Sequence, residues 1–153
     1  MTQVDFYILP DSSDHARFLL ACRLADKAVQ HRLGVFVLTD TESEARKLDE
    51  LLWTFAQNSF LPHRLAWEAD AASEEPVLIG CRERSHPDAQ QAEPDESPCW
   101  DLIVNLTAEI PETFGRYERL AEVVDADPAR REGGRVRYRY YRDRGYELKT
   151  HQL

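Results

Sequence analysis

The segment Arg135–Tyr146 carries the strongest chemical signal in the chain. Its sequence, RVRYRYYRDRGY, packs five arginines and four tyrosines into twelve residues. Guanidinium groups bind carboxylates or phosphates through paired hydrogen bonds, and tyrosine rings offer flat apolar contact. On a helix, the i, i+3 and i+4 spacings give a common face to Arg131, Arg135, Tyr138, Arg139 and Arg142. The residues of the opposite side, which can pack against a sheet, are Val136, Tyr140 and Tyr141.

Two kinds of ligand suit such a surface. The first is single-stranded nucleic acid, with its phosphates on the arginines and its bases stacked on the tyrosines. The second is an acidic peptide with an apolar anchor, for which an outlying Trp53 or Phe60 would line the anchor pocket. A third interpretation assigns no ligand, because a solvated basic helix with buried tyrosines has the same composition.

The charge distribution favours an acidic peptide over nucleic acid. The formal net charge of the 153 residues is −9, whereas a DNA-binding surface is expected to be basic overall or on one face. Residues 1–128 hold 11 basic and 25 acidic side chains, and residues 129–153 hold 8 basic and 3 acidic ones. The end of the chain is therefore a basic element on an acidic body.

Motifs for catalysis, nucleotide binding and metal binding are missing from the sequence. The first expected strand is followed by PDSSDHAR, which has no glycine to bring backbone amides to a phosphate and has two aspartates that would repel one. Neither the histidines nor the cysteines, Cys22, Cys81 and Cys99, have metal-ligand spacing. We therefore predict a protein that is not an enzyme and uses no cofactor and no metal.

The same cysteine pattern and the absence of targeting segments favour a cytoplasmic protein. Three cysteines without a pairing pattern are typical of a reducing compartment. The N-terminus, MTQVDFYILP, has no basic region before its apolar stretch, so it indicates a strand and not a signal peptide. No apolar run approaches the roughly 20 residues that span a bilayer.

Strand and helix patterns alternate along the chain and predict one α/β domain over residues 1–153. Apolar runs typical of strands occur at Val4–Leu9, Val35–Leu38, Val77–Gly80, Trp100–Leu106 and Leu120–Val124, with an edge strand at Tyr146–Thr150. Helical spacing extends from the Ser12–Asp14 cap region to about Leu33, over Glu42–Phe55, and over about 129–144 after Pro128. We expect a three-layer Rossmann-like sandwich, a mostly parallel sheet with helices on both faces, and no nucleotide-binding glycine loop.

Four local features qualify this outline. Trp53 lies roughly 140° from the centre of the apolar face of its helix, so it must pack on another element or meet a partner. Residues 58–63 are expected to form a loop. Residues 85–98 are acidic, contain three prolines and are expected to form a flexible loop. The pair Gly133-Gly134 is expected to fray the start of the last helix or to delay it.

The chain resembles the chi subunit of bacterial DNA polymerase III holoenzyme, which belongs to the clamp-loader assembly. The resemblance rests on VDFYIL, LGVFVLTD, LDELLW, SFLPHRL, LIVNL and VVD, followed by the Arg/Tyr-rich segment that ends at Gly145-Tyr146. These stretches occur in the family's order and cover nearly the whole chain. The pair LDxxLW and SFxPH, combined with the basic terminal helix, is the most specific part.

The resemblance implies a non-catalytic α/β subunit with no bound nucleotide. Chi proteins bind the acidic C-terminal tail of single-stranded-DNA-binding protein, which is rich in aspartate and ends in an apolar pair with a terminal phenylalanine. They bind the psi subunit on a separate surface, contact single-stranded DNA only indirectly, and do not associate with membranes. Residues 85–98 are not among the stretches that carry the resemblance.

Residue by residue, the resemblance assigns the tail-binding contacts as follows. The basic contacts fall on Arg131, Arg135 and Arg139, with Tyr138 beside them, and Arg130 is an alternative to Arg131 because the segment before Arg135 is shorter than the family pattern. The aromatic wall falls on Trp53 and Phe60, and Thr150 lies near the rim. In this arrangement Arg135 takes the terminal carboxylate, and the two aromatic side chains enclose the terminal ring.

Two rival functions remain open at this stage. The first is direct binding of single-stranded nucleic acid by the same C-terminal helix, which would use the arginines and tyrosines as a stacking platform. The second is an enzyme with an unrecognised nucleotide site, which would need a pocket at the carboxyl ends of the strands.

Overall fold

A seven-stranded sheet with the order β3-β4-β2-β5-β6-β1-β7 forms the middle layer of the molecule. The structure is a computed structural model that describes residues 2–56, 61–69, 74–83 and 101–153. All pairings between neighbouring strands in these residues are parallel. The strands are β1 (Gln3–Ile8), β2 (Val35–Thr39), β3 (His63–Leu65), β4 (Val77–Cys81), β5 (Leu102–Asn105), β6 (Arg119–Val124) and β7 (Leu148–Gln152).

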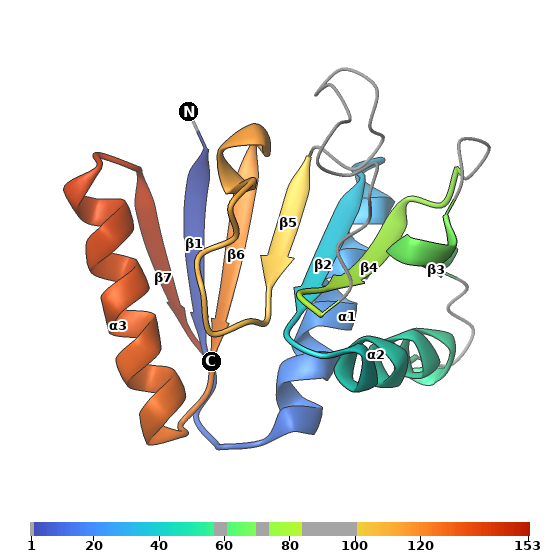
Figure 1. The fold of residues 1–153 in the computed structure, drawn as a ribbon, viewed down its shortest axis with the longest axis horizontal. Helices are drawn as coiled ribbons and strands as arrows, with labels where there is room; N and C mark the ends of the chain where they lie inside the picture. The colour runs from blue at the N-terminus through green and yellow to red at the C-terminus, as the bar shows by residue number, and fades with distance from the viewer. Residues whose placement is uncertain (1, 57–60, 70–73, 84–100) are drawn as a thin grey trace.

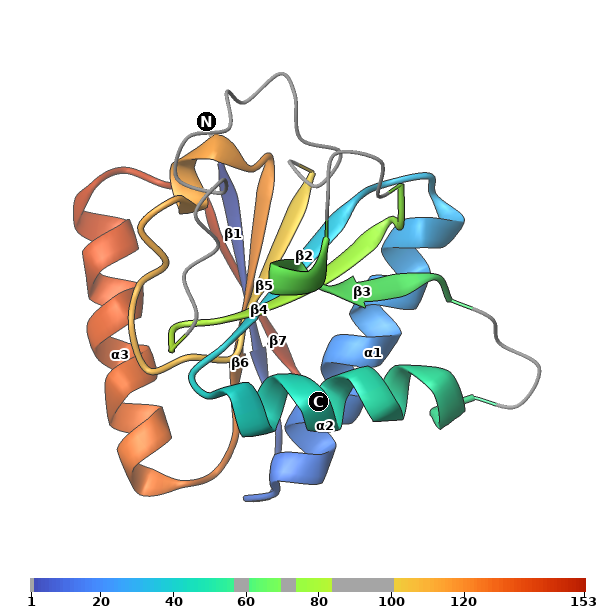
Figure 2. The same ribbon diagram turned by 45° about the vertical axis from the view of Figure 1, so that its right-hand side comes forward.

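The helices lie on both faces of this sheet. Helices α1 (Asp14–Gln30) and α2 (Glu42–Thr54) pack together on one face, and α3 (Pro128–Asp143) lies on the other, next to β7 (Figures 1 and 2). The short 3-10 helix Phe114–Arg116 contributes Phe114 to the core on the α3 side. The expected three-layer Rossmann-like sandwich is therefore confirmed, with a sheet that is parallel throughout the described residues.

Side-chain patterning accounts for the two cores. On one face of the sheet, side chains of β2, β4 and β6 pack against α1 and α2. The buried residues of these two helices include Phe18, Cys22, Leu48 and Leu52. On the other face, Val4 and Phe6 of β1 pack with Leu120 of β6 and Tyr141 of α3. Because successive strand residues point to opposite faces, strands β1, β2, β5 and β6 contribute side chains to both cores.

Two details differ from the sequence prediction, and a third prediction falls outside the described residues. The loop predicted at residues 58–63 leads into β3, a strand of three residues that is too short to show an alternating apolar pattern. The predicted flexible loop at residues 85–98 lies outside the described residues. Helix α3 begins at Pro128 without a delay, because the Asp127 carboxylate accepts a hydrogen bond from the Arg130 amide at 3.0 Å. The glycines permit a close approach to the sheet: a Cβ on Gly134 would lie 2.9 Å from a methyl carbon of Val124.

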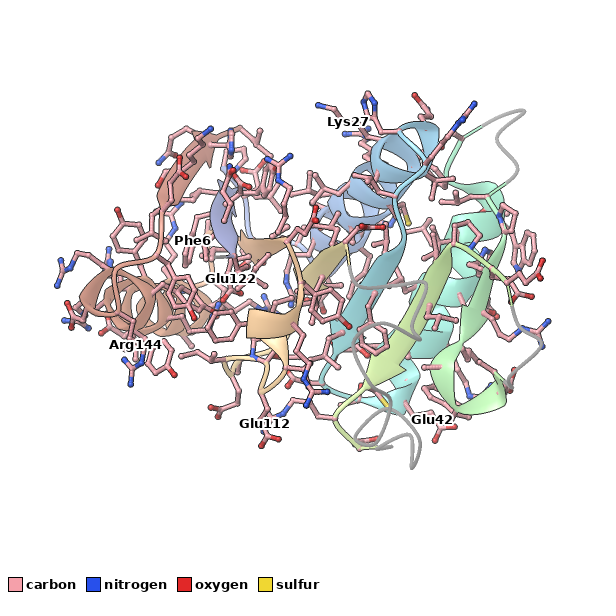
Figure 3. The ribbon with its side chains drawn as sticks, turned by 90° about the horizontal axis from the view of Figure 1, so that it is seen from above. Phe6, Lys27, Glu42, Glu112, Glu122 and Arg144 are labelled. Carbon is pink, nitrogen blue, oxygen red and sulfur yellow. The ribbon has the colours of Figure 1, made fainter. Side chains whose placement is uncertain are left out.

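A buried carboxylate fixes α3 to the sheet. Glu122, in the middle of β6, is fully buried and points toward α3 near Phe6 (Figure 3). It accepts hydrogen bonds from Arg137 Nε at 3.0 Å, from the Tyr141 hydroxyl at 2.9 Å and from Asn105 Nδ2 at 2.6 Å. Burial raises the pKa of the Glu122 carboxyl, and the Arg137 guanidinium opposes this rise.

The inward face of α3 therefore differs from the predicted one. Tyr141 is buried as predicted, but Val136 is 52% exposed and Arg137 takes the inward position. The reason is the charge of Glu122, which needs a cationic partner inside the protein. Arginine supplies this partner and additionally donates to the Ala108 carbonyl at 3.1 Å.

Arg137→Ala should lower the free energy of unfolding by about 3–5 kcal/mol, because it leaves the Glu122 carboxylate buried without its cation. Urea unfolding near neutral pH measures this loss. The deficit should shrink as the pH falls, since burial raises the pKa of Glu122 and the folded variant therefore takes up a proton more readily than the unfolded chain. The matched control is Arg139→Ala on the exposed face of α3, for which the change should stay within about 0.5 kcal/mol. Equal stabilities of the two variants would contradict the proposed role of Arg137.

Candidate functional site

The predicted basic face of α3 borders a pocket between α3 and the β7 side of the sheet. The pocket has a volume of about 330 Å³, and its lining residues come from β1, β6, α3 and β7: Phe6, Ile8, Val124, Arg131, Gly134, Arg135, Tyr138, Thr150 and Gln152. Phe6 and Val124 are buried and form an apolar floor, whereas Arg135, Thr150 and Gln152 are exposed at the rim. The pocket thus combines an apolar base with cationic and polar edges.

Local packing explains why a hollow exists here. Gly134 has no side chain to fill the space above Val124, where even a Cβ would be too close. Tyr138 leans against Phe6 edge-to-face, with the ring centroids 5.3 Å apart, so its ring forms a wall. The parallel register of β1 and β7 places Thr150 opposite Phe6 and Gln152 opposite Ile8 on this same face.

Arg135, which lines the pocket, and Arg139, which lies one turn further along α3, make only exposed pairs. Arg135 lies 3.4 Å from Glu132, and Arg139 lies 3.8 Å from the same carboxylate, with all three side chains more than half exposed. Such pairs contribute little to stability, so the guanidinium groups can exchange this partner for a ligand carboxylate. Arg131 donates through Nε to the Asp125 carbonyl at 3.2 Å and lines the pocket.

Arg130, the alternative to Arg131 as a tail-binding residue, does not line the pocket and has a structural role. Its guanidinium pairs with Asp125 at 2.9 Å and with Asp14, at the start of α1, at 2.7 Å. Asp125 is fully buried and also accepts from the Ser13 and Asp127 amides. Arg130 therefore ties α3 to the start of α1, and the pocket-lining residue is Arg131.

Trp53 does not lie at this pocket. It is on α2, which packs on the opposite face and contacts β3 and β4 at the far end of the sheet. Its ring is 50% exposed and sits 4.1 Å from the ring of His63. The prediction that Trp53 encloses the same ligand ring as Arg135 is therefore wrong. Phe60, its predicted companion, lies outside the described residues.

The chemistry of the pocket is that of binding. Its described lining residues combine apolar side chains with two arginines, a tyrosine hydroxyl, a threonine hydroxyl and a glutamine amide, and include no carboxylate, cysteine or histidine. In the turn before α1, the Ser13 hydroxyl accepts from the Ala16 amide, so a side chain of the protein occupies the place where a phosphate would bind in a nucleotide-binding fold.

No group of three or more His, Cys, Asp or Glu side chains in the described ranges is arranged to hold a metal ion. No helix among the described residues has both the length and the apolar character needed to cross a membrane.

Comparison with known proteins identifies the family. Residues 1–149 match the family model described as DNA polymerase III chi subunit, HolC. The chain belongs to this chi subunit family. The name is that of an accessory subunit and not of a catalytic one.

Curated chi subunits match over nearly their full length. The chain is 39% identical over 153 residues to DNA polymerase III subunit chi of Pseudomonas aeruginosa, covering 100% of this chain and 98% of that protein. It is 28% identical over 148 residues to the Haemophilus influenzae chi subunit, covering 97% and 95%. The Escherichia coli chi subunit is 24% identical over 154 residues, covering 98% and 97%.

A solved structure shares the fold. The crystal structure of T4 UvsW aligns with a TM-score of 0.71 and 11% sequence identity. The alignment covers 99% of this chain but only 41% of that one. At this identity the likeness concerns the α/β fold alone.

Sequence reasoning found the rim of the chi subunit pocket but missed its floor. Arg131, Arg135, Tyr138 and Thr150 come together as expected. Phe6, Ile8, Val124 and Gln152 were not singled out, because apolar strand residues give no sign of which ones stay uncovered. One signal could have found these floor residues. The C-terminal edge strand was expected to join the sheet, and its pairing with the first strand places Thr150 beside Phe6.

Arg130→Ala is expected to reduce the free energy of unfolding by about 1–3 kcal/mol, because it removes the charged partner of the buried Asp125. Arg131→Ala, the neighbouring control, should cost less than about 1 kcal/mol because its partner is a backbone carbonyl. Urea titration followed by tryptophan fluorescence measures both variants. A larger loss for Arg131→Ala would reverse the division of roles between the two arginines.

Proposed function

We propose that this chain is a non-catalytic replisome adaptor that binds the acidic C-terminal tail of single-stranded-DNA-binding protein in the α3 pocket. Its partner on another surface is the psi subunit, through which it links the tail to the DNA polymerase III clamp loader in the cytoplasm. Its contact with single-stranded DNA is indirect. The observation that carries the proposal is an apolar-floored pocket rimmed by arginines on an acidic protein.

The parts of the tail match the parts of the pocket. The terminal phenylalanine ring enters between Tyr138 and the floor formed by Phe6 and Val124, where burial of its apolar surface favours binding. The terminal carboxylate takes Arg135 as its cation, because a charge-assisted bond to a guanidinium is stronger than a neutral one. Thr150 adds a hydroxyl at the rim.

The arginines on either side of Arg135 act on the acidic part of the tail. Arg139 is exposed on α3 and lies one turn beyond Arg135, and Arg131 lies one turn before it. Attraction between these cations and a run of aspartates accelerates association and is screened by salt. The pairs with Glu132 are the contacts that the tail would displace.

Direct binding of single-stranded nucleic acid is less well supported. A stacking platform needs exposed aromatic faces, but Tyr141 is fully buried and Tyr146 packs edge-to-face on Phe114 at 5.2 Å. Tyr140 is covered by the guanidinium of Arg144, whose carbon lies 3.4 Å from the ring centroid. These contacts use the tyrosines to hold α3 in place.

The first test is fluorescence anisotropy with a labelled acidic peptide that ends in phenylalanine with a free carboxylate. Arg135→Ala should weaken its binding by about 2 kcal/mol, or roughly 30-fold, through loss of the charge-assisted bond. The matched control is Arg144→Ala, at the residue that follows α3, where the guanidinium is stacked on Tyr140; this variant should bind within about twofold of the unchanged protein. Unchanged affinity of the Arg135 variant would remove Arg135 from the site.

Two further arms separate the rival functions. A peptide without the terminal phenylalanine should bind far more weakly, and binding of the intact peptide should weaken as salt is added. A labelled single-stranded oligonucleotide should not compete. Binding of the oligonucleotide with no preference for the intact peptide would overturn the adaptor function.

Trp53→Ala should leave the affinity for the same peptide within about twofold, because distant residues that share no contacts affect the protein independently of one another. The variant retains α3 and all of the pocket-lining residues, since Trp53 lies on the opposite face of the sheet. The same anisotropy titration provides the measurement. A loss as large as that of Arg135→Ala would show that the tail reaches across the molecule, contrary to the geometry.

A further inference from the structure

The outer edge of β7 presents unpaired backbone groups. β7 is the last strand of the sheet, and no described strand pairs with its outer side. The Val4 amide donates to the Glu147 carbonyl and the Leu153 amide donates to the Ile8 carbonyl, each at 3.0 Å. In a parallel pair this register directs the amides and carbonyls of residues 149 and 151 toward β1. Those of Leu148, Thr150 and Gln152 therefore face outward.

The free edge and the pocket share residues. Thr150 and Gln152, whose backbone groups face outward, also line the pocket with their side chains. Both residues are exposed. Helix α3 runs alongside β7 (Figure 1), and its Arg131 and Arg135 line the same pocket as Thr150 and Gln152. A chain whose end enters the pocket must therefore pass within reach of the open backbone groups of β7.

We propose that the acidic tail binds by β-augmentation, as an eighth strand added to β7. This inference rests on the proposed function and adds to it the way in which the main chain is recognised. Hydrogen bonds to an edge strand recognise any extended peptide, and the pocket and the charges supply the selectivity. An aspartate-rich segment suits the mechanism, since its charges meet the cations of α3 while its backbone pairs with β7.

The positions of the arginines set the direction of the added strand. Helix α3 begins after the carboxyl end of β6 and ends before the amino end of β7, so it runs opposite to the strands. The exposed cations beyond Arg135 are Arg139 and Arg142, which lead toward the amino end of β7. In the other direction Arg131 already donates to the Asp125 carbonyl, and Arg130 is paired with two aspartates. A tail with its carboxylate at Arg135 therefore runs parallel to β7.

Charge argues against a second copy of this chain as the occupant. Two copies joined edge to edge through β7 would bring Lys149 and the arginines of α3 close to their own counterparts. Like charges placed opposite one another in a sheet are destabilising. An acidic segment instead places opposite charges along the same edge.

Amide hydrogen exchange followed by NMR tests the added strand directly. In the free protein the amides of residues 149, 151 and 153 should exchange slowly, and those of Thr150 and Gln152 quickly. Saturation with a peptide of aspartates ending in Ile-Phe should slow exchange at Thr150 by at least tenfold. A nitroxide on the amino end of the peptide should broaden Leu148 more than Gln152. The reverse order would overturn the parallel direction.

Two chemical series test the same contacts from both sides. N-methylation of the peptide at alternate residues should weaken binding about 5-fold or more at every second position, since each lost hydrogen bond contributes about a factor of 5. Thr150→Val retains the outward amide and removes the hydroxyl, whereas Thr150→Pro also removes the amide, which an edge strand tolerates. The proline variant should bind at least about 5-fold more weakly than the valine variant.

The outcomes separate this inference from the proposed function. If the unmodified peptide does not bind, the proposed function fails. If the peptide binds, but N-methylation has no alternating effect and the Thr150 amide is not protected from exchange, the eighth strand is overturned. In that case the proposed binding of the tail in the pocket still holds. Protection of the same amides by raising the protein concentration without peptide, with dimers in sedimentation, would assign the edge to a second copy and overturn the inference.

Discussion

The arrangement of the whole α3 side depends on one buried charge. Glu122 stands in the middle of the sheet, where a carboxylate without partners would be very unfavourable. Arg137 and Tyr141 supply partners from α3, and their spacing of four residues puts both on the same side of that helix. The ion pair fixes the rotation of α3 about its axis. The arginines at positions 131, 135 and 139 consequently point to the outside of the helix, where the pocket forms.

The pocket itself is a consequence of how closely α3 approaches the sheet. Gly134 lets the helix sit against Val124, and Tyr138 rests on Phe6 without closing the space between α3 and β7. A larger residue at 134 would push the helix outward and fill the hollow at the same time. The feature that looked unfavourable in the sequence, two glycines inside a helix, is thus required by the packing at Gly134.

The sequence allowed the fold and the rim of the α3 pocket to be predicted, for identifiable reasons. Alternating strand and helix patterns gave the layers, and helical spacing gave the face with Arg131 and Arg135. Helical spacing correctly placed Trp53 away from the apolar face of its own helix. Periodicity, however, gives only the side of a helix on which a residue lies. It does not give the layer or the end of the sheet where that helix packs, so Trp53 was assigned to the wrong surface. Arg137 was missed because nothing in a run of arginines marks the one that faces a buried acid.

The edge strand joins fold and function through the same physical property. An unpaired strand edge is a template for association, which proteins limit with short strands and charged side chains. β7 is five residues long and carries Lys149 and His151, which favours a charged partner over general aggregation. His151 is further engaged by Asp5 at 3.1 Å and stacks on Tyr7, so the face of β7 away from α3 is already in use. The outer edge and the α3 side remain for a ligand, and there the exposed charges are mainly positive. An acidic extended peptide therefore satisfies the free backbone groups, the arginines and the apolar floor together, whereas a nucleic acid would satisfy only the arginines.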